Sequence, residues 1–406
     1  MRALDAPALR LRYLTLLGLR WFPTGLLLPV TTLLAVERGL SLAEIGLAMS
    51  VQGLVVVALE LPTGGLADSW GRRPVLVLAA VAGLGSLAVL AIADSPAMFA
   101  LAWALQGIFR ALDSGPLESW YVDAALAVEP HVRLDRALGM GGTVIGIVLG
   151  AGALVSGALV AWVALPSLPA LLLPVLVALA VQLVGSVALL LLPPESRQRR
   201  SRWEPVFEMP AVIVAGVRTV CRSRPLAALA VIQLAWGFGI VAVETLLPVR
   251  IAELAGGTTA AAEIMGPAVA GAWLLSAAGA AAAPLLASRI GIIGAAVTLR
   301  ALHGATIVAM GLLAGPVGAL AGFGLAYLTQ GAVNPLYASL LHRHVPASVR
   351  TTTLSITSMA GQCRWALGLI TLSAVADAVS TMTAIVLGGI VLAATAPLYL
   401  MSRVGR

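Results

Sequence analysis

The chain has 406 residues, of which 60% are hydrophobic and only 11% are charged, whereas about 25% of residues in soluble globular domains are charged. This composition excludes a soluble globular protein and indicates a chain embedded in a lipid bilayer. The net charge of +7 comes from arginines scattered between apolar runs, which excludes the single basic face of a nucleic-acid-binding protein.

Apolar runs of about 20–25 residues, long enough to cross a hydrocarbon layer of about 30 Å, occur along the whole chain. The first run is too long for the apolar core of a cleaved signal peptide, so we interpret it as a retained span. Polar breaks divide the runs into twelve predicted transmembrane helices, at residues 12–36, 42–67, 75–93, 97–121, 137–161, 168–192, 225–248, 264–287, 293–314, 317–340, 352–376 and 380–401. The sequence therefore predicts an all-α polytopic membrane protein.

The only long polar segment lies between the sixth and seventh predicted spans and is rich in arginine. It predicts a cytoplasmic linker at 194–224, between an N-terminal six-helix bundle at 1–193 and a C-terminal six-helix bundle at 225–406. Three arginines, Arg20, Arg110 and Arg364, lie within spans, and most of the others lie at the chain ends or in loops on the same side. By the positive-inside rule, both termini are predicted to be cytoplasmic.

The two predicted halves resemble each other. The run LAWALQG at 101–107 matches LAYLTQG at 325–331, and LADSWG at 66–71 matches LASRIG at 286–291. The similar offsets, 224 and 220 residues, indicate a duplicated six-helix unit with pseudo-symmetric halves, although chance similarity between apolar runs is the alternative. In such repeats the binding site lies near the midplane, between the halves.

The stretch GGLADSWGRRPV at 64–75 is short, polar and glycine-rich between two apolar runs. Glycines permit a sharp reversal, and Arg72 and Arg73 favour the cytoplasmic side, so it predicts a tight cytoplasmic elbow. The stretch resembles the loop signature G-x-L-A-D-x-x-G-R-[RK] of the major facilitator superfamily of transporters. That resemblance implies a conformational latch formed by Asp68, Arg72, Arg73 and Asp123.

Glycines 142, 146 and 150 lie on one face of the fifth predicted span. Small residues on one face let neighbouring helices approach closely. The pattern therefore predicts tight packing along this helix.

Ionisable residues inside the membrane are the candidates for a functional site. A charge at the bilayer centre costs about 2.5–3.5 kcal/mol, so such residues normally face a partner or a wet cavity. In the fourth span, Trp103, Gln106, Arg110 and Asp113 lie within a sector of about 80°. One interpretation is that Arg110 and Asp113 form a fixed ion pair that holds helices together.

The other interpretation is proton coupling. Three intramembrane arginines cannot neutralise four carboxylates one for one, and a buried carboxyl that holds a proton suits a proton-coupled carrier. Asp113 and Glu60 are the first candidates for the proton-coupling carboxylate, and Glu118 and Glu244 are the next. The candidates for a substrate cavity are Arg20, Trp103, Gln106, Arg110, Trp236, Gln330, Asn334 and Arg364.

The run RALDSGPLESWYVD at 110–123 and the run ELPTG at 60–64 resemble a bacterial subgroup of facilitators that export small molecules and drugs. The resemblance implies a multi-pass exporter of the bacterial cytoplasmic membrane. Together with the buried carboxylates it predicts the exchange of protons for small amphipathic compounds, and a monomer is expected because each chain contains both halves of the pathway. The alternative is a carrier of an anionic or lipid-like solute bound by Arg20, Arg110 and Arg364. A membrane-embedded enzyme or scaffold is the remote alternative, since no catalytic, phosphate-binding or metal-binding motif is present, and no cofactor is expected.

Overall fold

A computed structural model of the chain describes residues 6–70, 72–113, 116–129, 134–190, 223–344 and 350–402. Its account of side chains leaves out residues 6, 60–70, 72–73, 116, 135–136, 342, 344 and 350–360. Every regular element in the described ranges is helical. The predicted all-helical fold is confirmed for this part of the chain.

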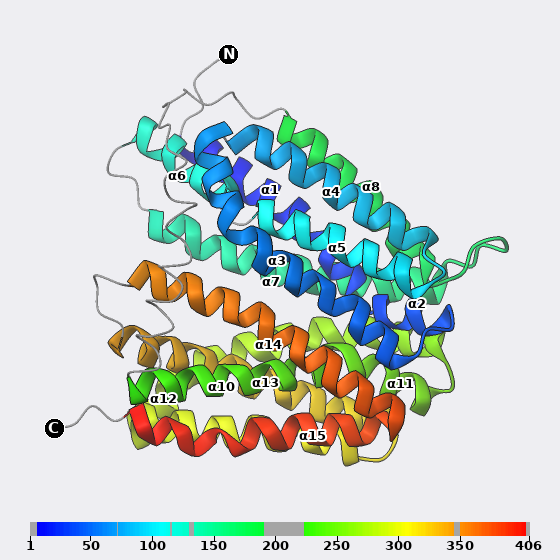
Figure 1. Cartoon of the computed structure of the whole chain (residues 1–406), viewed down its shortest axis with the longest axis vertical. Helices are drawn as coiled ribbons and strands as arrows, with labels where there is room; N and C mark the ends of the chain where they lie inside the picture. Colours follow the sequence, from blue (N-terminus) through cyan, green and yellow to red (C-terminus); the bar gives the residue numbers. More distant parts are fainter. Residues whose placement is uncertain are drawn as a thin grey trace.

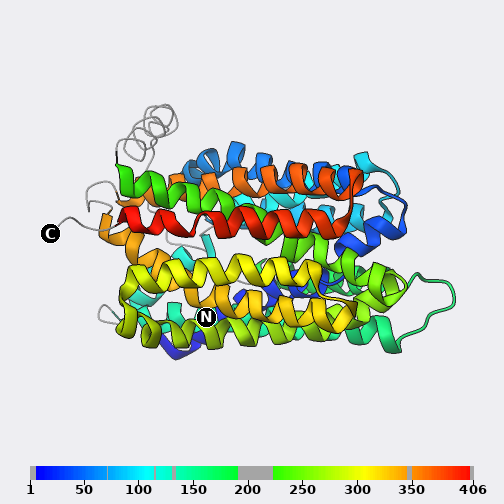
Figure 2. The same ribbon diagram turned by 90° about the horizontal axis from the view of Figure 1, so that it is seen from below.

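The helices lie in two groups, which Figure 1 shows one above the other. The N-group consists of α1 (Ala6–Leu27), α2 (Thr31–Glu37), α3 (Leu42–Trp70), α4 (Arg72–Ile92), α5 (Pro96–Asp113), α6 (Pro116–Val128), α7 (Leu134–Trp162) and α8 (Leu172–Leu190). The C-group consists of α10 (Arg224–Val241), the π-helix η1 (Ala242–Leu246), α11 (Leu247–Ala255), α12 (Thr258–Leu312), α13 (Gly315–His344), α14 (Arg350–Ala378), α15 (Thr381–Ala394) and the 3₁₀-helix η3 (Ala396–Ser402). Seen from below, the helices of the C-group run along a shared direction (Figure 2).

Eight described helical segments are long and apolar enough to cross a membrane. The helices α5, α13 and α14 are not among them, although each is at least 18 residues long. In α5 the polar residues Gln106, Arg110 and Asp113 lower the hydropathy. A multi-pass membrane protein is therefore confirmed, while the number of twelve spans stays a prediction.

Two predicted spans are interrupted in the structure. The helix predicted at 97–121 is not one of them: it is described as α5, up to Asp113, and α6, from Pro116, and residues 114–115 lie outside the described part of the chain. The first span is divided into α1 and α2, and the seventh contains the π-helical turn η1. A π-turn widens the helix and is frequent at functional sites.

Two predicted connections also differ from the structure. The predicted spans at 264–287 and 293–314 form the single run α12, in which Gly291 alone departs from helical geometry, with φ 75° and ψ 158°. These angles favour glycine, and they mark the reversal between the two halves of the run. The predicted elbow at 64–75 is mostly helical, because α3 continues to Trp70 and α4 begins at Arg72.

One end of the molecule joins the two groups tightly. We call it the sealed end; it holds α2 and α11, at the right of Figure 1. A Cβ added to Gly157 of α7 would lie 3.0 Å from the Cα of Gly266 in α12, and one added to Gly53 of α3 would lie 3.0 Å from the Gln362 carbonyl oxygen in α14. The largest buried apolar cluster also draws on both groups there, with Leu33 and Leu246 among its members.

The opposite end, which holds α6 and the start of α7, is the open end. The face of α7 that meets α12 at Gly150 and Gly157 continues through residues 146, 142 and 139, where an added Cβ would meet nothing within 4 Å. Of the three glycines for which tight packing was predicted, Gly150 has only ordinary contact, 3.7 Å from the Cα of Ala270, and Gly142 and Gly146 have none. The two groups diverge toward this end (Figure 1).

Candidate functional site

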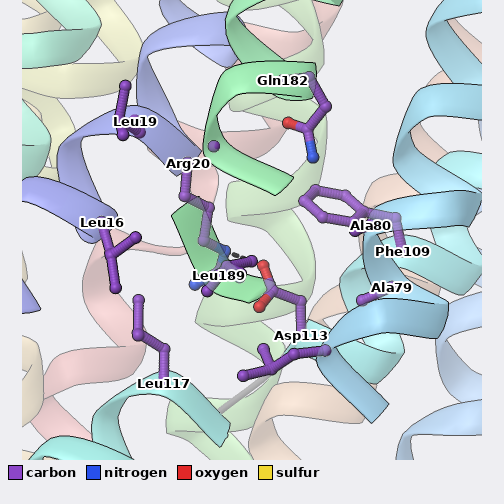
Figure 3. Close-up of a pocket in the computed structure, with 12 residues that line it drawn as sticks. Leu16, Leu19, Arg20, Ala79, Ala80, Phe109, Asp113, Leu117, Gln182 and Leu189 are labelled. Atoms are coloured by element: carbon purple, nitrogen blue, oxygen red, sulfur yellow. Dashed lines mark ion pairs between the residues drawn. The ribbon is translucent and has the colours of Figure 1, made fainter. Parts of the chain in front are cut away.

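An ion pair between Arg20 and Asp113 lies inside the N-group. Arg20 comes from α1 and Asp113 from the end of α5, and Asp113 is only 3% exposed. Figure 3 shows the guanidinium group of Arg20 facing the Asp113 carboxylate, with Leu117 below and Phe109 and Gln182 above. The ion pair with Arg110 that the sequence suggested for Asp113 is not the one that the structure shows, because the α1 residue Arg20 is the partner.

The cavity beside this pair has a volume of about 20 Å³ and is lined by residues of α1, α4, α5, α6 and α8. A volume of this size accommodates about one water molecule, whereas sites for drug-sized ligands measure about 300–1,000 Å³. Arg20 also lies over the ring of Trp21, at 5.5 Å from its centroid. Arg20 and Asp113 therefore line a water-sized cavity within one helix group and do not line a substrate-sized site.

Glu244 lies in the π-helical turn η1 of the C-group. The hydroxyl of Tyr327, on α13, donates a hydrogen bond of 3.4 Å to Glu244 Oε1. The Tyr327 ring makes edge contacts with Phe323 at 5.0 Å and with Trp273 at 6.0 Å. The carboxylate is thus held beside an aromatic cluster, defined here as Trp273, Phe323 and Tyr327.

Arg110 connects the N-group to this carboxylate. It lies on α5, its side chain is exposed, and its charge acts on Glu244 of the C-group. Its neighbour Asp113 points back into the N-group, three residues along the same helix. The single polar face predicted for Trp103, Gln106, Arg110 and Asp113 is therefore divided, because Asp113 is buried and Trp103 packs against the largest apolar cluster.

A third set of candidates lies in the C-group. The guanidinium carbon of Arg364, on α14, is 4.9 Å from the centroid of the Trp236 ring on α10, a distance suited to a cation–π interaction. Gln330 is half-buried and Asn334 is exposed on α13, and Gln106 is half-buried on α5. The structure thus brings Trp236 and Arg364 together.

Other predicted residues are placed less informatively. Glu118 and Asp123, both on α6, are exposed. The side chains of Glu60, Asp68, Arg72 and Arg73 lie outside the described part of the structure. The latch of Asp68, Arg72, Arg73 and Asp123 therefore stays a prediction, as does the role of Glu60.

The structure also reveals buried polar residues that the sequence analysis missed. Arg300 lies in the second part of α12 and is 1% exposed, and its Nη2 donates a 3.1 Å hydrogen bond to the Tyr399 hydroxyl. His303, one turn further on, is 2% exposed. Arg300 is not among the three arginines that the sequence analysis places within spans, although the apolar run at 293–314 surrounds it. Within the described residues, no group of three His, Cys, Asp or Glu side chains is arranged to hold a metal ion.

Comparisons with known proteins agree with this architecture. The structure is similar to the crystal structure of the nucleoside transporter NupG, with a TM-score of 0.80 and 14% identity over 98% of this chain and 100% of that one. It is also similar to a bacterial homologue of the human lysosomal transporter Spinster in an inward-facing and occupied conformation, with a TM-score of 0.72 and 14% identity over 97% of this chain and 96% of that one. Similarity at this identity shows the fold alone.

No curated protein sequence matches the chain significantly. The sequence model described as Major Facilitator Superfamily matches residues 14–369. The match covers most of the chain, and it agrees with the loop signature at 64–75, the helical fold and both structural neighbours. The chain is therefore a transporter, not an enzyme, and it belongs to the Major Facilitator Superfamily.

Proposed function

We propose that the protein is a proton-coupled secondary transporter that exports small amphipathic compounds, with Glu244 as the coupling carboxylate. The observation that carries the proposal is the position of Glu244. It lies in a π-helical turn, receives a hydrogen bond from Tyr327, and interacts with Arg110 of the other helix group. A carboxylate that is bonded within one group and attracted by a charge of the other can change the interaction between the two groups when it gains or loses a proton.

The coupling works through the charge of Glu244. When Glu244 is ionised, its attraction to Arg110 draws α5 toward the C-group. When Glu244 takes up a proton, that attraction is lost and the two groups can separate. A membrane potential supplies about 2.3 kcal/mol per charge for each 100 mV, so one proton per cycle is a sufficient driving force for export.

The transport cycle is alternating access by rocking of the two helix groups. The proposed topology has twelve spans in two six-helix bundles, at 1–193 and 225–406. A linker at 194–224 joins the bundles, and both termini are cytoplasmic. The open end then faces the cytoplasm, so the described conformation is inward-facing. We place the protein as a monomer in a bacterial cytoplasmic membrane, because one chain already supplies both sides of the pathway.

The aromatic cluster supports an amphipathic substrate. Trp273, which is half-buried beside the buried Tyr327, combines a large apolar surface with a polar group, and such rings bind flat apolar or cationic compounds. Because the structural neighbour NupG is titled a nucleoside transporter, nucleosides belong in the substrate panel beside lipophilic cations, zwitterions and anions.

The test is a proteoliposome assay in which a substrate is added outside and the collapse of an imposed pH gradient is followed. We expect one substrate class to collapse the gradient with the unaltered protein and not with Glu244→Gln, which still exchanges labelled substrate without a gradient. Glu263→Gln, at an exposed carboxylate of α12, is the matched control and keeps coupling. Proton movement that persists in Glu244→Gln contradicts the assignment, and its loss in folded Asp113→Asn transfers the role to Asp113.

A carrier of anionic or lipid-like solutes is the second candidate. It is favoured by Arg364, whose Nε and Nη1 atoms have no hydrogen-bond partner among the described residues. Arg20 is already paired with Asp113, which leaves Arg364 as the better anchor for a negative group. In the same panel this candidate predicts that only anions are transported and that Arg364→Gln abolishes their transport.

A further inference from the structure

Two arginines of the C-group lie in the interior, far from the ends of their helices. Arg300 is nine residues beyond the kink at Gly291, and Arg364 is fourteen residues from either end of α14. At 1.5 Å per residue, they lie about 14 Å and about 21 Å from those points. The charge of Arg300 acts on Arg364, so the two guanidinium groups repel each other.

Tyr337 of α13 connects the surroundings of the two arginines. Its hydroxyl interacts with Gln233 of α10 and lies within electrostatic range of Tyr399, Arg364 and Arg300. The guanidinium carbon of Arg300 is 5.9 Å from the centroid of the Tyr399 ring. Four helices and η3 therefore converge on this region, which we call the arginine site: Gln233, Arg300, Tyr337, Arg364 and Tyr399.

The arginine site has more N–H donors than acceptors. The Nε and Nη1 atoms of both Arg300 and Arg364 are buried and have no hydrogen-bond partner among the described residues. The described carboxylates of the C-group are engaged or distant: Glu244 with Tyr327, Glu253 with Arg250 and Thr381, and Glu263 and Asp377 exposed. Aromatic rings cover the faces of the guanidinium groups, but they do not accept hydrogen bonds from the N–H groups at the edges.

We propose that the arginine site binds a small monovalent anion, held by the guanidinium edges of Arg300 and Arg364. A buried guanidinium group with unpaired N–H donors and no counter-charge is strongly unfavourable, because arginine stays protonated and cannot neutralise itself by losing a proton. An anion supplies both the charge and the acceptors. Arg300 is almost fully buried, and both its chain neighbour Leu299 and its partner Tyr399 belong to a buried apolar cluster, so the anion must shed its water, which favours chloride over phosphate or sulfate.

This inference is independent of the proposed proton coupling, because the site lies away from Glu244 and its test requires no transport. The probe is chloride, added to the purified full-length protein in detergent at constant ionic strength with gluconate as the replacement anion. We expect the melting temperature to rise and then saturate with chloride. Labelled chloride should bind at a stoichiometry of about one per chain.

Variants separate the site from a general salt effect. Arg364→Gln should abolish saturable chloride binding, and Arg300→Gln should do the same. Arg300→Lys, which keeps the charge, gives a folded variant with weakened binding if Arg300→Gln fails to fold. The control Arg289→Gln, at an exposed position of the same helix α12, should keep the chloride effect in full.

Competition distinguishes a free anion from a negative group on the substrate. A substrate whose carboxylate occupies the arginine site would displace labelled chloride in proportion to its own binding, whereas an independent anion would stay bound. Either result supports an anion site at these residues. A melting temperature that is insensitive to chloride, or a chloride effect equally large in Arg364→Gln, overturns the proposal.

Discussion

Arg20 of α1 pairs with Asp113 of α5 across the interior of the N-group, and the two partners differ in burial. The side chain of Arg20 is 24% exposed, whereas that of Asp113 is 4% exposed. Removing one partner from a buried pair leaves the other charge without compensation. The cost should therefore depend on which residue is left behind.

The first prediction is an asymmetry between the two single variants. Arg20→Gln leaves the buried Asp113 unpaired and should destabilise the protein by about 3–5 kcal/mol, whereas Asp113→Asn leaves Arg20, which reaches water, and should cost less. The double variant should recover much of the loss. Thermal unfolding in detergent measures all three, and equal losses in the two single variants would show that burial is not the deciding factor.

The second prediction concerns the hydrogen bond from Tyr327 to Glu244. Tyr327→Phe removes one hydrogen bond to a carboxylate, worth about 1.5 kcal/mol or more, so transport rates should fall by about tenfold or more with the fold intact. Tyr337→Phe, which removes a hydroxyl that bonds to the backbone of Leu229, is a control on the same helix and should leave coupling unchanged. The comparison uses initial rates of substrate-driven proton movement. An unchanged rate in Tyr327→Phe would show that the hydrogen bond to Glu244 has no part in coupling.

The third prediction concerns Arg38, which follows α2 at the sealed end. Its guanidinium group donates hydrogen bonds to the carbonyls of Leu90, Ala91 and Ala93, where α4 ends. A cation at a helix C-terminus that also satisfies free carbonyls is stabilising. Arg38→Gln should lower the free energy of unfolding by about 1.5–3 kcal/mol. Arg38→Lys should have an intermediate effect, because it keeps the charge but cannot donate to several carbonyls in the geometry of a guanidinium group. Melting temperatures test the order, and a Lys variant as stable as the parent contradicts it.

The fourth prediction uses the uneven packing along α7. Gly157 faces Gly266 at close range, whereas Gly142 has open space. Gly157→Val should force the sealed end apart and expose it to water, while Gly142→Val should be tolerated in the described conformation and slow closure of the open end. Accessibility of single cysteines placed at the two ends can be compared in variants that lack Cys221 and Cys363. Identical labelling patterns for Gly157→Val and Gly142→Val would refute this difference.

The sequence predicted the broad architecture because hydropathy and arginine placement depend on the bilayer alone. It did not locate the break between α1 and α2 or the π-turn η1, because these depend on local backbone geometry inside otherwise apolar runs. Nothing in the amino-acid sequence around Glu244 distinguishes a π-helical turn from an α-helical turn.

The structure changes the partner expected for Asp113, while the functional roles of the candidate residues stay predictions. Asp113 and Glu244 were both candidates, but which arginine each one meets depends on how α1 and α5 pack, and helical spacing on one span cannot supply that. Arg300 was missed for another reason: because it is charged and lies near the start of a predicted span, it was assigned to a loop. The apolar residues on both sides of it were the stronger signal.

The interruptions in the first and seventh spans have a mechanical consequence. The short helices α2 and α11 follow a break in their spans, and they contact each other at the sealed end. Each is a tip attached to its main helix through a turn that is not α-helical. Opening of the sealed end therefore does not require the two helix groups to tilt as whole bodies. The short helices α2 and α11 can move apart while α1 and α10 stay in place.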